Sequence, residues 1–70
     1  MSADELKKLV PKWAATVGVE AARLTLQQAG LGYSTVEMLR KGEYPSTPND
    51  KTCDKLRLAM KDYLAELEAS

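Results

Sequence analysis

The chain has 70 residues, a hydrophobic content of 44% and no net charge, with ten basic and ten acidic side chains. A chain of this length forms one domain, and its regularly spaced apolar residues exclude an intrinsically disordered segment and a membrane-spanning helix, which needs about 18 consecutive apolar residues. Histidine is absent and cysteine occurs once, so no disulfide framework, catalytic imidazole or common zinc site is expected, and we predict no enzyme, metal or cofactor.

The charges are distributed unevenly. Residues 1–61 carry ten basic and seven acidic side chains, a net charge of +3, whereas residues 62–70 carry three acidic and no basic ones. A weakly basic body with an acidic tail is compatible with DNA binding, although most DNA-binding modules have a larger excess of Lys and Arg. The N-terminus lacks the basic region and apolar core of a signal peptide, so we expect a cytoplasmic protein that does not contact membranes.

The first predicted helix covers residues 3–17. Ser2 and Glu5 have the spacing of a capping box, in which each side chain accepts a hydrogen bond from the other residue's backbone amide. Pro11 removes one helical hydrogen bond, but the apolar stripe stays in phase across it, so we predict a single helix kinked at this proline. The apolar residues of the stripe are Leu6, Leu9, Val10, Trp13, Ala14 and Val17.

A second helix is predicted over residues 19–29. Gly18 ends the first helix, and Glu20 suits the positive end of the next helix dipole. Gly30 then allows a tight turn, because glycine readily takes the positive φ that such a turn demands. The buried face of this second helix is predicted to contain Val19, Ala22, Leu26 and Ala29.

The third predicted helix, residues 33–41, is short and has two different faces. Leu31, Val36 and Leu39 are expected to anchor it, and Gly42 stands at its C-terminal cap position. A short helix that buries one side and exposes polar groups on the other fits a DNA major groove, although any helical hairpin closed by glycine is the alternative. The residues predicted to face outward are Tyr33, Ser34, Glu37, Met38 and Lys41.

Residues 43–47 are predicted to form a loop, because Pro45 and Pro48 prevent a regular element. A fourth helix is then expected over residues 48–68, with Thr47 as its N-cap and Pro48 at its first position. No segment has the alternation of a β-strand, so the predicted fold is all-α, a compact domain of four to five helices.

The fourth predicted helix has one apolar face. Its members are Cys53, Leu56, Met60, Tyr63, Leu64 and Leu67. Cys53 is interpreted as a small buried hydrophobic residue rather than a reactive thiol. The seam either packs inward against Trp13 and Val17 or, toward the end of the helix, forms a symmetric dimer contact through Tyr63, Leu64 and Leu67.

Residues 18–67 resemble the Cro and lambda-repressor-like (XRE-type) helix-turn-helix family of bacteria and their phages. The segment AGLGYSTVEMLRKG, residues 29–42, is similar to the family pattern of Ala-Gly-Val-Ser, a polar residue, Ser-Thr-Ile and a later glycine. The matching residues are Ala29, Gly30, Leu31, Ser34, Thr35, Val36, Leu39 and Gly42. The following Pro45-Ser46 and the segment with Leu56, Ala59 and Met60 also look like the family's continuation.

Two positions depart from this pattern. Leu26 stands where the family usually has a small residue, most often Ala, so a wider separation or a different crossing of the two helices is expected. Gly32 replaces the small hydroxyl residue that caps the recognition helix, and glycine is the weaker cap. The resemblance nevertheless covers most of the chain and implies that residues 1–70 form a single helix-turn-helix domain.

The resemblance implies that the third helix reads DNA bases. Ser34 can donate to or accept from a base edge or a phosphate, Glu37 can accept from a cytosine amine, and Lys41 can reach guanine or the backbone. Tyr33 and Met38 offer apolar contact, for example to a thymine methyl group. The residues expected to contact phosphates are Arg23, Gln27, Gln28, Arg40 and Tyr44, for which ordinary solvated surface is the alternative.

The function implied is that of a small transcriptional regulator, a Cro-like repressor that binds double-stranded operator DNA as a homodimer. The alternative is a helical adaptor or inhibitor that binds another protein, such as a polymerase subunit, a repressor or a toxin, through the same exposed face. The absence of net charge favours this alternative, because a protein partner requires no counterion release.

Overall fold

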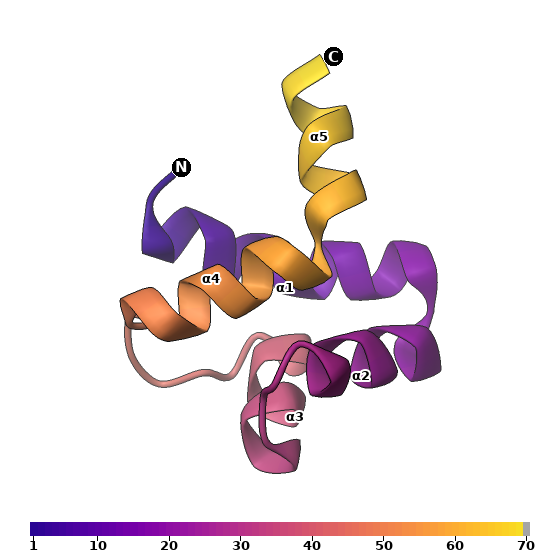
Figure 1. Ribbon diagram of the computed structural model, residues 1–70. Coiled ribbons are helices and arrows are strands. Elements are labelled where there is room, and N and C mark those ends of the chain that lie inside the picture. Colours follow the sequence, from indigo (N-terminus) through magenta and orange to yellow (C-terminus); the bar gives the residue numbers. More distant parts are fainter. Residues whose placement is uncertain (70) are drawn as a thin grey trace.

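The computed structural model describes residues 1–69 of the chain. These residues form five α-helices and no β-strand, which confirms the all-α prediction. The helices are α1 (Ala3–Val17), α2 (Val19–Gln28), α3 (Tyr33–Lys41), α4 (Asp50–Ala59) and α5 (Lys61–Ala69). The first four helices enclose the core, and α5 projects from it (Figure 1). No helix among residues 1–69 has both the length and the apolar character needed to cross a membrane.

The N-terminus of α1 has the predicted capping box. Glu5 N donates to Ser2 Oγ, and Ser2 N donates to Glu5 Oε1, each at 3.2 Å. The helix continues through Pro11 as one element, so the prediction of a single helix is confirmed. This continuity keeps the buried residues of α1 on one side over its whole length.

One apolar core joins α1 to α4. It consists of Leu6, Val10, Trp13, Ala14, Ala22, Leu26, Leu31, Val36, Leu39, Cys53, Leu56 and Met60. The prediction that Cys53 is buried is therefore confirmed. Val17 and Val19, which were expected in the core, are each 44% exposed. They flank Gly18, where the chain turns from α1 into α2 and both side chains are carried out of the helix interface.

The corner between α2 and α3 is held by Gly30, whose φ is +103°. Lys55 of α4 crosses this corner and its Nζ donates to the Gly30 carbonyl at 3.1 Å. The positive φ favours glycine at this position, and a Cβ on residue 30 would come within 3.3 Å of Lys55 Cε, so the lysine side chain would have to shift slightly. Leu26, the departure from the family pattern, is fully buried in the core. α3 runs across the direction of α2 (Figure 1).

The C-terminus of α3 ends as predicted. Gly42 has a φ of +76°, in the left-handed region, and its backbone amide donates to the Leu39 carbonyl at 3.2 Å. The amide of Glu43 donates to the Met38 carbonyl at 2.8 Å. These two bonds satisfy carbonyls at the end of the helix and turn the chain away from its axis.

The connection from α3 to α4 is fastened to α1. Lys7 Nζ donates to the Ser46 carbonyl at 3.0 Å and to the Tyr44 carbonyl at 3.5 Å. Thr47 Oγ1 donates to Asp4 Oδ1 at 2.8 Å. The connection is therefore held by the first turns of α1.

The predicted start of the fourth helix, at Pro48 with Thr47 as N-cap, was wrong. Asn49 is the N-cap, and its Oδ1 accepts a hydrogen bond from Thr52 N at 2.8 Å. Thr47 lies outside the helix, where its hydroxyl donates to Asp4, and Pro48 is buried before the helix begins.

The prediction of one helix over residues 48–68 was also wrong, because Met60 divides it into α4 and α5. Met60 has φ −100° and ψ 14°, and its side chain is fully buried. Its amide still donates to Leu56 O at 2.9 Å, and its carbonyl accepts from Leu64 N at 2.9 Å. The bend at Met60 lets this side chain enter the core while α5 leaves the direction of α4 (Figure 1).

Candidate nucleic-acid interface

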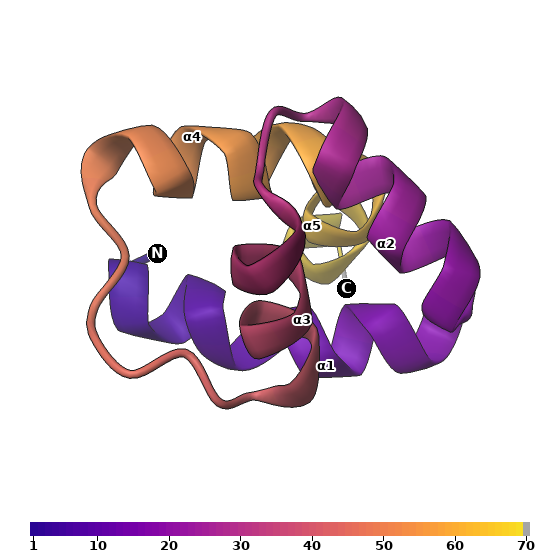
Figure 2. The same cartoon turned by 90° about the horizontal axis from the view of Figure 1, so that it is seen from below.

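α3 presents one side to solvent at the end of the molecule opposite α5, and it faces the viewer in Figure 2. Tyr33 is 65% exposed, Ser34 and Lys41 are exposed, and Met38 is half-buried. The helical period places these four residues on one side of α3. We call them the α3 outer face.

Glu37 does not face solvent freely as predicted. Its side chain is 15% exposed and lies between two arginines. Arg23 Nε donates to Glu37 Oε1 at 2.5 Å, and Arg40 Nη2 donates to Glu37 Oε2 at 2.5 Å. Glu37 therefore links α2 to α3 through these hydrogen bonds. In this arrangement its carboxylate is not free to accept a hydrogen bond from a cytosine amine.

The residues expected to contact phosphates fall into two groups. Gln27 and Gln28 are exposed on α2. Arg23 and Arg40 are bound to Glu37, and the Arg40 side chain is only 15% exposed. Tyr44 is half-buried against the core. Arg40 and Tyr44 are thus turned toward the protein, whereas Arg23 keeps part of its guanidinium at the surface.

The two arginines hold Glu37 in its charged form. Hydrogen bonds from Arg40 and then from Arg23 lower the pKa of Glu37 from 4.5 to about 2. The hydrogen bond that Arg23 donates to Glu37 also raises the pKa of Arg23. Glu37 and Arg23 therefore remain ionised over the whole physiological range, and the carboxylate is neutralised by the cations beside it.

Glu37→Gln is expected to make protein stability less dependent on pH. Because folding lowers the pKa of Glu37, its contribution is fully present above pH 4.5 and is lost as the pH falls toward about 2. The difference in Tm between the wild type and the variant, followed by circular dichroism, should be largest near neutral pH and shrink below pH 4.5. Glu43→Gln, at an exposed position outside this cluster, is the control. An equal difference at all pH values would contradict the prediction.

A hollow of about 460 Å³ borders the α3 outer face. It is lined by Glu20, Ala21, Arg23, Leu24, Gln27 and Tyr33. Sequence reasoning did not assign Glu20 or Leu24 to a site. The available signal was that Leu24 falls outside the helical stripe of Ala22 and Leu26, which places it on the outer side of α2. The hollow makes the outer side of α2 continuous with the α3 outer face.

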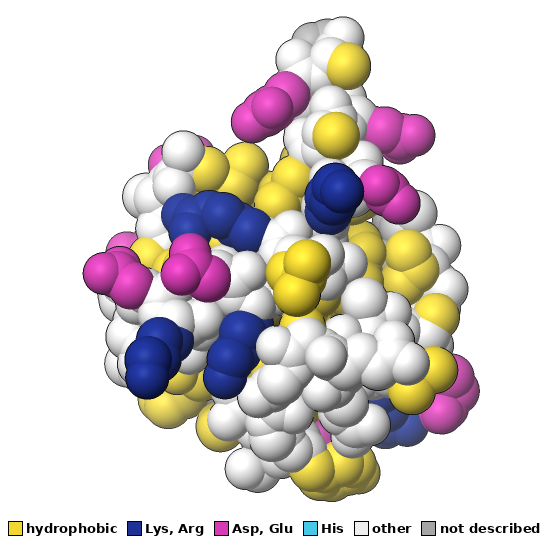
Figure 3. Space-filling view, viewed as in Figure 1, with side chains coloured by type: hydrophobic (Ala, Val, Ile, Leu, Met, Phe, Trp, Pro, Cys, Tyr) yellow, Lys and Arg dark blue, Asp and Glu magenta, His cyan; other side chains and the backbone are white. Residues whose placement is uncertain are grey.

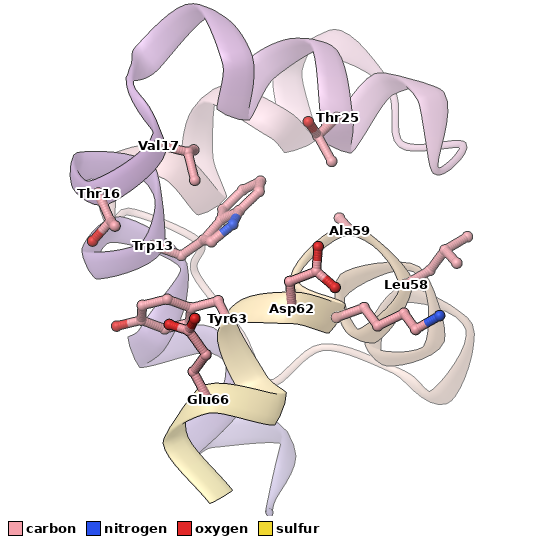
Figure 4. A pocket seen from close by; sticks show the side chains of 10 residues that line it. Trp13, Thr16, Val17, Thr25, Leu58, Ala59, Asp62, Tyr63 and Glu66 are labelled. Carbon is pink, nitrogen blue, oxygen red and sulfur yellow. The ribbon is translucent and has the colours of Figure 1, made fainter. Parts of the chain in front are cut away.

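A second hollow, of about 560 Å³, lies at the base of α5 (Figure 4). Its apolar lining comes from Trp13, Val17, Leu58, Ala59 and Tyr63. Of the predicted dimer contacts, Tyr63 and Leu64 are half-buried against the core and Leu67 is exposed. Figure 3 shows acidic side chains around α5, on the part of the molecule farthest from the α3 outer face.

The side chains of the α3 outer face can bind a partner through hydrogen bonds, charge and apolar contact. Residues 1–69 contain no group of three side chains that could hold a metal ion. The α3 outer face instead combines a hydroxyl, an ammonium group and two apolar side chains on a helix anchored by the core. Comparison of the chain with known protein families, with curated proteins and with solved structures gives no match.

Proposed function

We propose that the protein is a small DNA-binding transcriptional regulator, a Cro-like repressor that reads an operator through its α3 outer face. The observation that carries this proposal is the exposure of Tyr33, Ser34 and Lys41 on one side of a short helix whose other side is fully buried. Such a helix can enter the major groove with its side chains against base edges. The resemblance of residues 18–67 to the Cro and lambda-repressor-like helix-turn-helix family supports the same function.

The distribution of charge supports this proposal despite the absence of net charge. Arg23 and Arg40 neutralise Glu37, so its carboxylate does not repel phosphates as an unpaired one would. The three acidic residues of α5 lie at the other end of the molecule. The surface around α3 is therefore more favourable for a polyanion than the total charge indicates.

DNA binding is tested by titration of a duplex pool selected from random sequences. We expect binding at about 50 mM salt and a steep loss of affinity as salt is added, because phosphate contacts release counterions. A dimer that neutralises two phosphates per subunit gives a slope of log K against log salt concentration of roughly −4. No binding near 50 mM salt, or affinity independent of salt, would exclude a DNA-binding function.

The regulator is proposed to act as a homodimer through α5. This helix has nine residues and no fully buried side chain, and only Tyr63 and Leu64 pack, half-buried, against the core. So short a helix gains stability from a further packing partner. Lys61 stands at the positive end of its helix dipole and Glu68 at the negative end, the unfavourable end for each charge. The helical period places Lys61, Leu64 and Glu68 on one face. An antiparallel second copy brings Lys61 to Glu68 of the other subunit and corrects both placements.

The second candidate function is an adaptor or inhibitor that binds another protein through the same side of α2 and α3. The exposed apolar pair Leu24 and Tyr33, at the hollow beside the α3 outer face, favours it. Exposed apolar side chains grouped beside a hollow are typical of protein contacts. Salt-insensitive behaviour in the titration above, with no bound duplex, would select this function over DNA binding.

A further inference from the structure

Arg23 is bound by two carboxylates that differ strongly in exposure. One edge of its guanidinium faces Glu37, with Nε at 2.5 Å from Oε1 and Nη2 at 3.5 Å from Oε2. Its Nη1 donates to Glu20 Oε1 at 2.8 Å. The Glu37 side chain is 15% exposed, whereas the Glu20 side chain is 88% exposed. Glu37 therefore fixes the direction of Arg23, and Glu20 only occupies its outer nitrogen.

The Glu20 pair is the weaker of the two. An exposed ion pair between residues three apart on a helix contributes little to stability, because water screens it and two side chains must be ordered. The pair with Glu37 is shielded from water and uses two nitrogens of the planar group. An anion that approaches from solvent can displace Glu20 without disturbing the edge held by Glu37.

The position of Glu20 matters because it lies beside the α3 outer face. Glu20 and Arg23 line the same hollow as Tyr33, the first residue of α3. A DNA strand whose groove contains α3 carries phosphates along its edge, next to this hollow. A phosphodiester oxygen has the charge and the hydrogen-bonding capacity of the Glu20 carboxylate.

We propose that Glu20 is a built-in substitute for a DNA phosphate, which occupies Arg23 Nη1 in the free protein and is displaced when duplex DNA binds. This inference rests on the proposed function. It assigns the protein's strongest contact with a DNA phosphate to Arg23 Nη1. Glu20 thereby lowers affinity for all sequences equally, because a phosphate contact carries no base information. Nonspecific DNA therefore binds too weakly to displace Glu20 readily, whereas an operator gains additional base contacts that compensate for this loss of affinity.

The test compares Glu20→Gln with Glu66→Gln, which removes the same charge from α5 at the opposite end of the molecule and lies off the face of Lys61, Leu64 and Glu68. Glu20→Gln is expected to raise affinity for a selected duplex about fivefold at low salt and to make the salt slope steeper by about one per subunit. Glu66→Gln is expected to change affinity less than twofold. In an Arg23→Gln background, Glu20→Gln should lose its advantage over Glu66→Gln.

The outcomes separate the two proposals. Equal gains from Glu20→Gln and Glu66→Gln, or a gain that survives in the Arg23→Gln background, would overturn the role of Glu20 while leaving DNA binding intact. If neither the wild type nor any variant binds duplex DNA at low salt, the proposed function fails and this inference fails with it. Circular dichroism of each variant checks that the helices are retained.

Discussion

Replacing Ser34 and Lys41 together by alanine is expected to weaken operator binding by at least about 100-fold, because each subunit of the dimer loses two polar contacts in the groove. Both side chains are exposed and Ser34 does not cap α3, so thermal stability should change little. The measurement is fluorescence anisotropy with a duplex selected by the wild-type protein. Affinity for random duplex should fall less than affinity for the selected one.

The matched control for this double variant is Lys8→Ala. Lys8 is exposed on α1, and the helical period places it away from the buried Leu6 and Val10. Its removal takes away one positive charge without touching α3, and should change affinity less than threefold. If Lys8→Ala weakens binding as much as the double variant, or if the double variant binds as the wild type does, α3 does not read the DNA.

Charge reversal at Lys61 or Glu68 is expected to dissociate the proposed α5 dimer. In an antiparallel pair each single substitution creates two like-charge contacts, which should raise the dimer dissociation constant at least about tenfold. Lys61→Glu and Glu68→Lys each improve the match to their own helix dipole, so helicity of the monomer should not decrease. Sedimentation equilibrium measures the association, and circular dichroism measures the helicity.

Mixing the two single variants gives the sharper result. Each homodimer of a single variant has like charges at both contacts. In the mixed dimer both contacts join an acidic side chain of one variant to a basic side chain of the other. Recovery of association in the mixture therefore requires direct pairing between positions 61 and 68. We therefore compare the mixture with the double variant Lys61→Glu with Glu68→Lys, whose homodimer has both pairs restored in reversed polarity. Glu43→Lys, outside α5, is the control. A wild type that is monomeric at all concentrations, or a double variant that stays dissociated, contradicts the pairing.

Local signals in the sequence were sufficient for most helix boundaries. The Ser2 and Glu5 capping box, the glycine between α1 and α2 and the Gly42 cap all act within one turn of the chain, and the structure has them where they were predicted. The α4–α5 break was not predictable in this way. No proline or glycine marks Met60, and the bend depends on the burial of its side chain in a core built from distant residues.

The exposure of residues on α3 was only partly predictable from the sequence. Helical spacing correctly placed Tyr33, Ser34 and Lys41 at the surface. The same spacing placed Glu37 there, but its main partner on α2 is Arg23, 14 positions earlier in the chain. The spacing within α3 does place Arg40 three positions from Glu37, but it carries no information about a cation on another helix, so only the packing of α2 against α3 reveals the second partner, Arg23.

The ties from Lys7 and Asp4 to residues 44–47 link the start of the chain to the segment that follows α3. The hydrogen bonds to Ser46 and from Thr47 span 39 and 43 positions, so the chain must close a long loop before either can form. A nascent chain that ends before Ser46 lacks both partners. Anchoring of this segment to α1 therefore requires that the whole of α3 has already been synthesised.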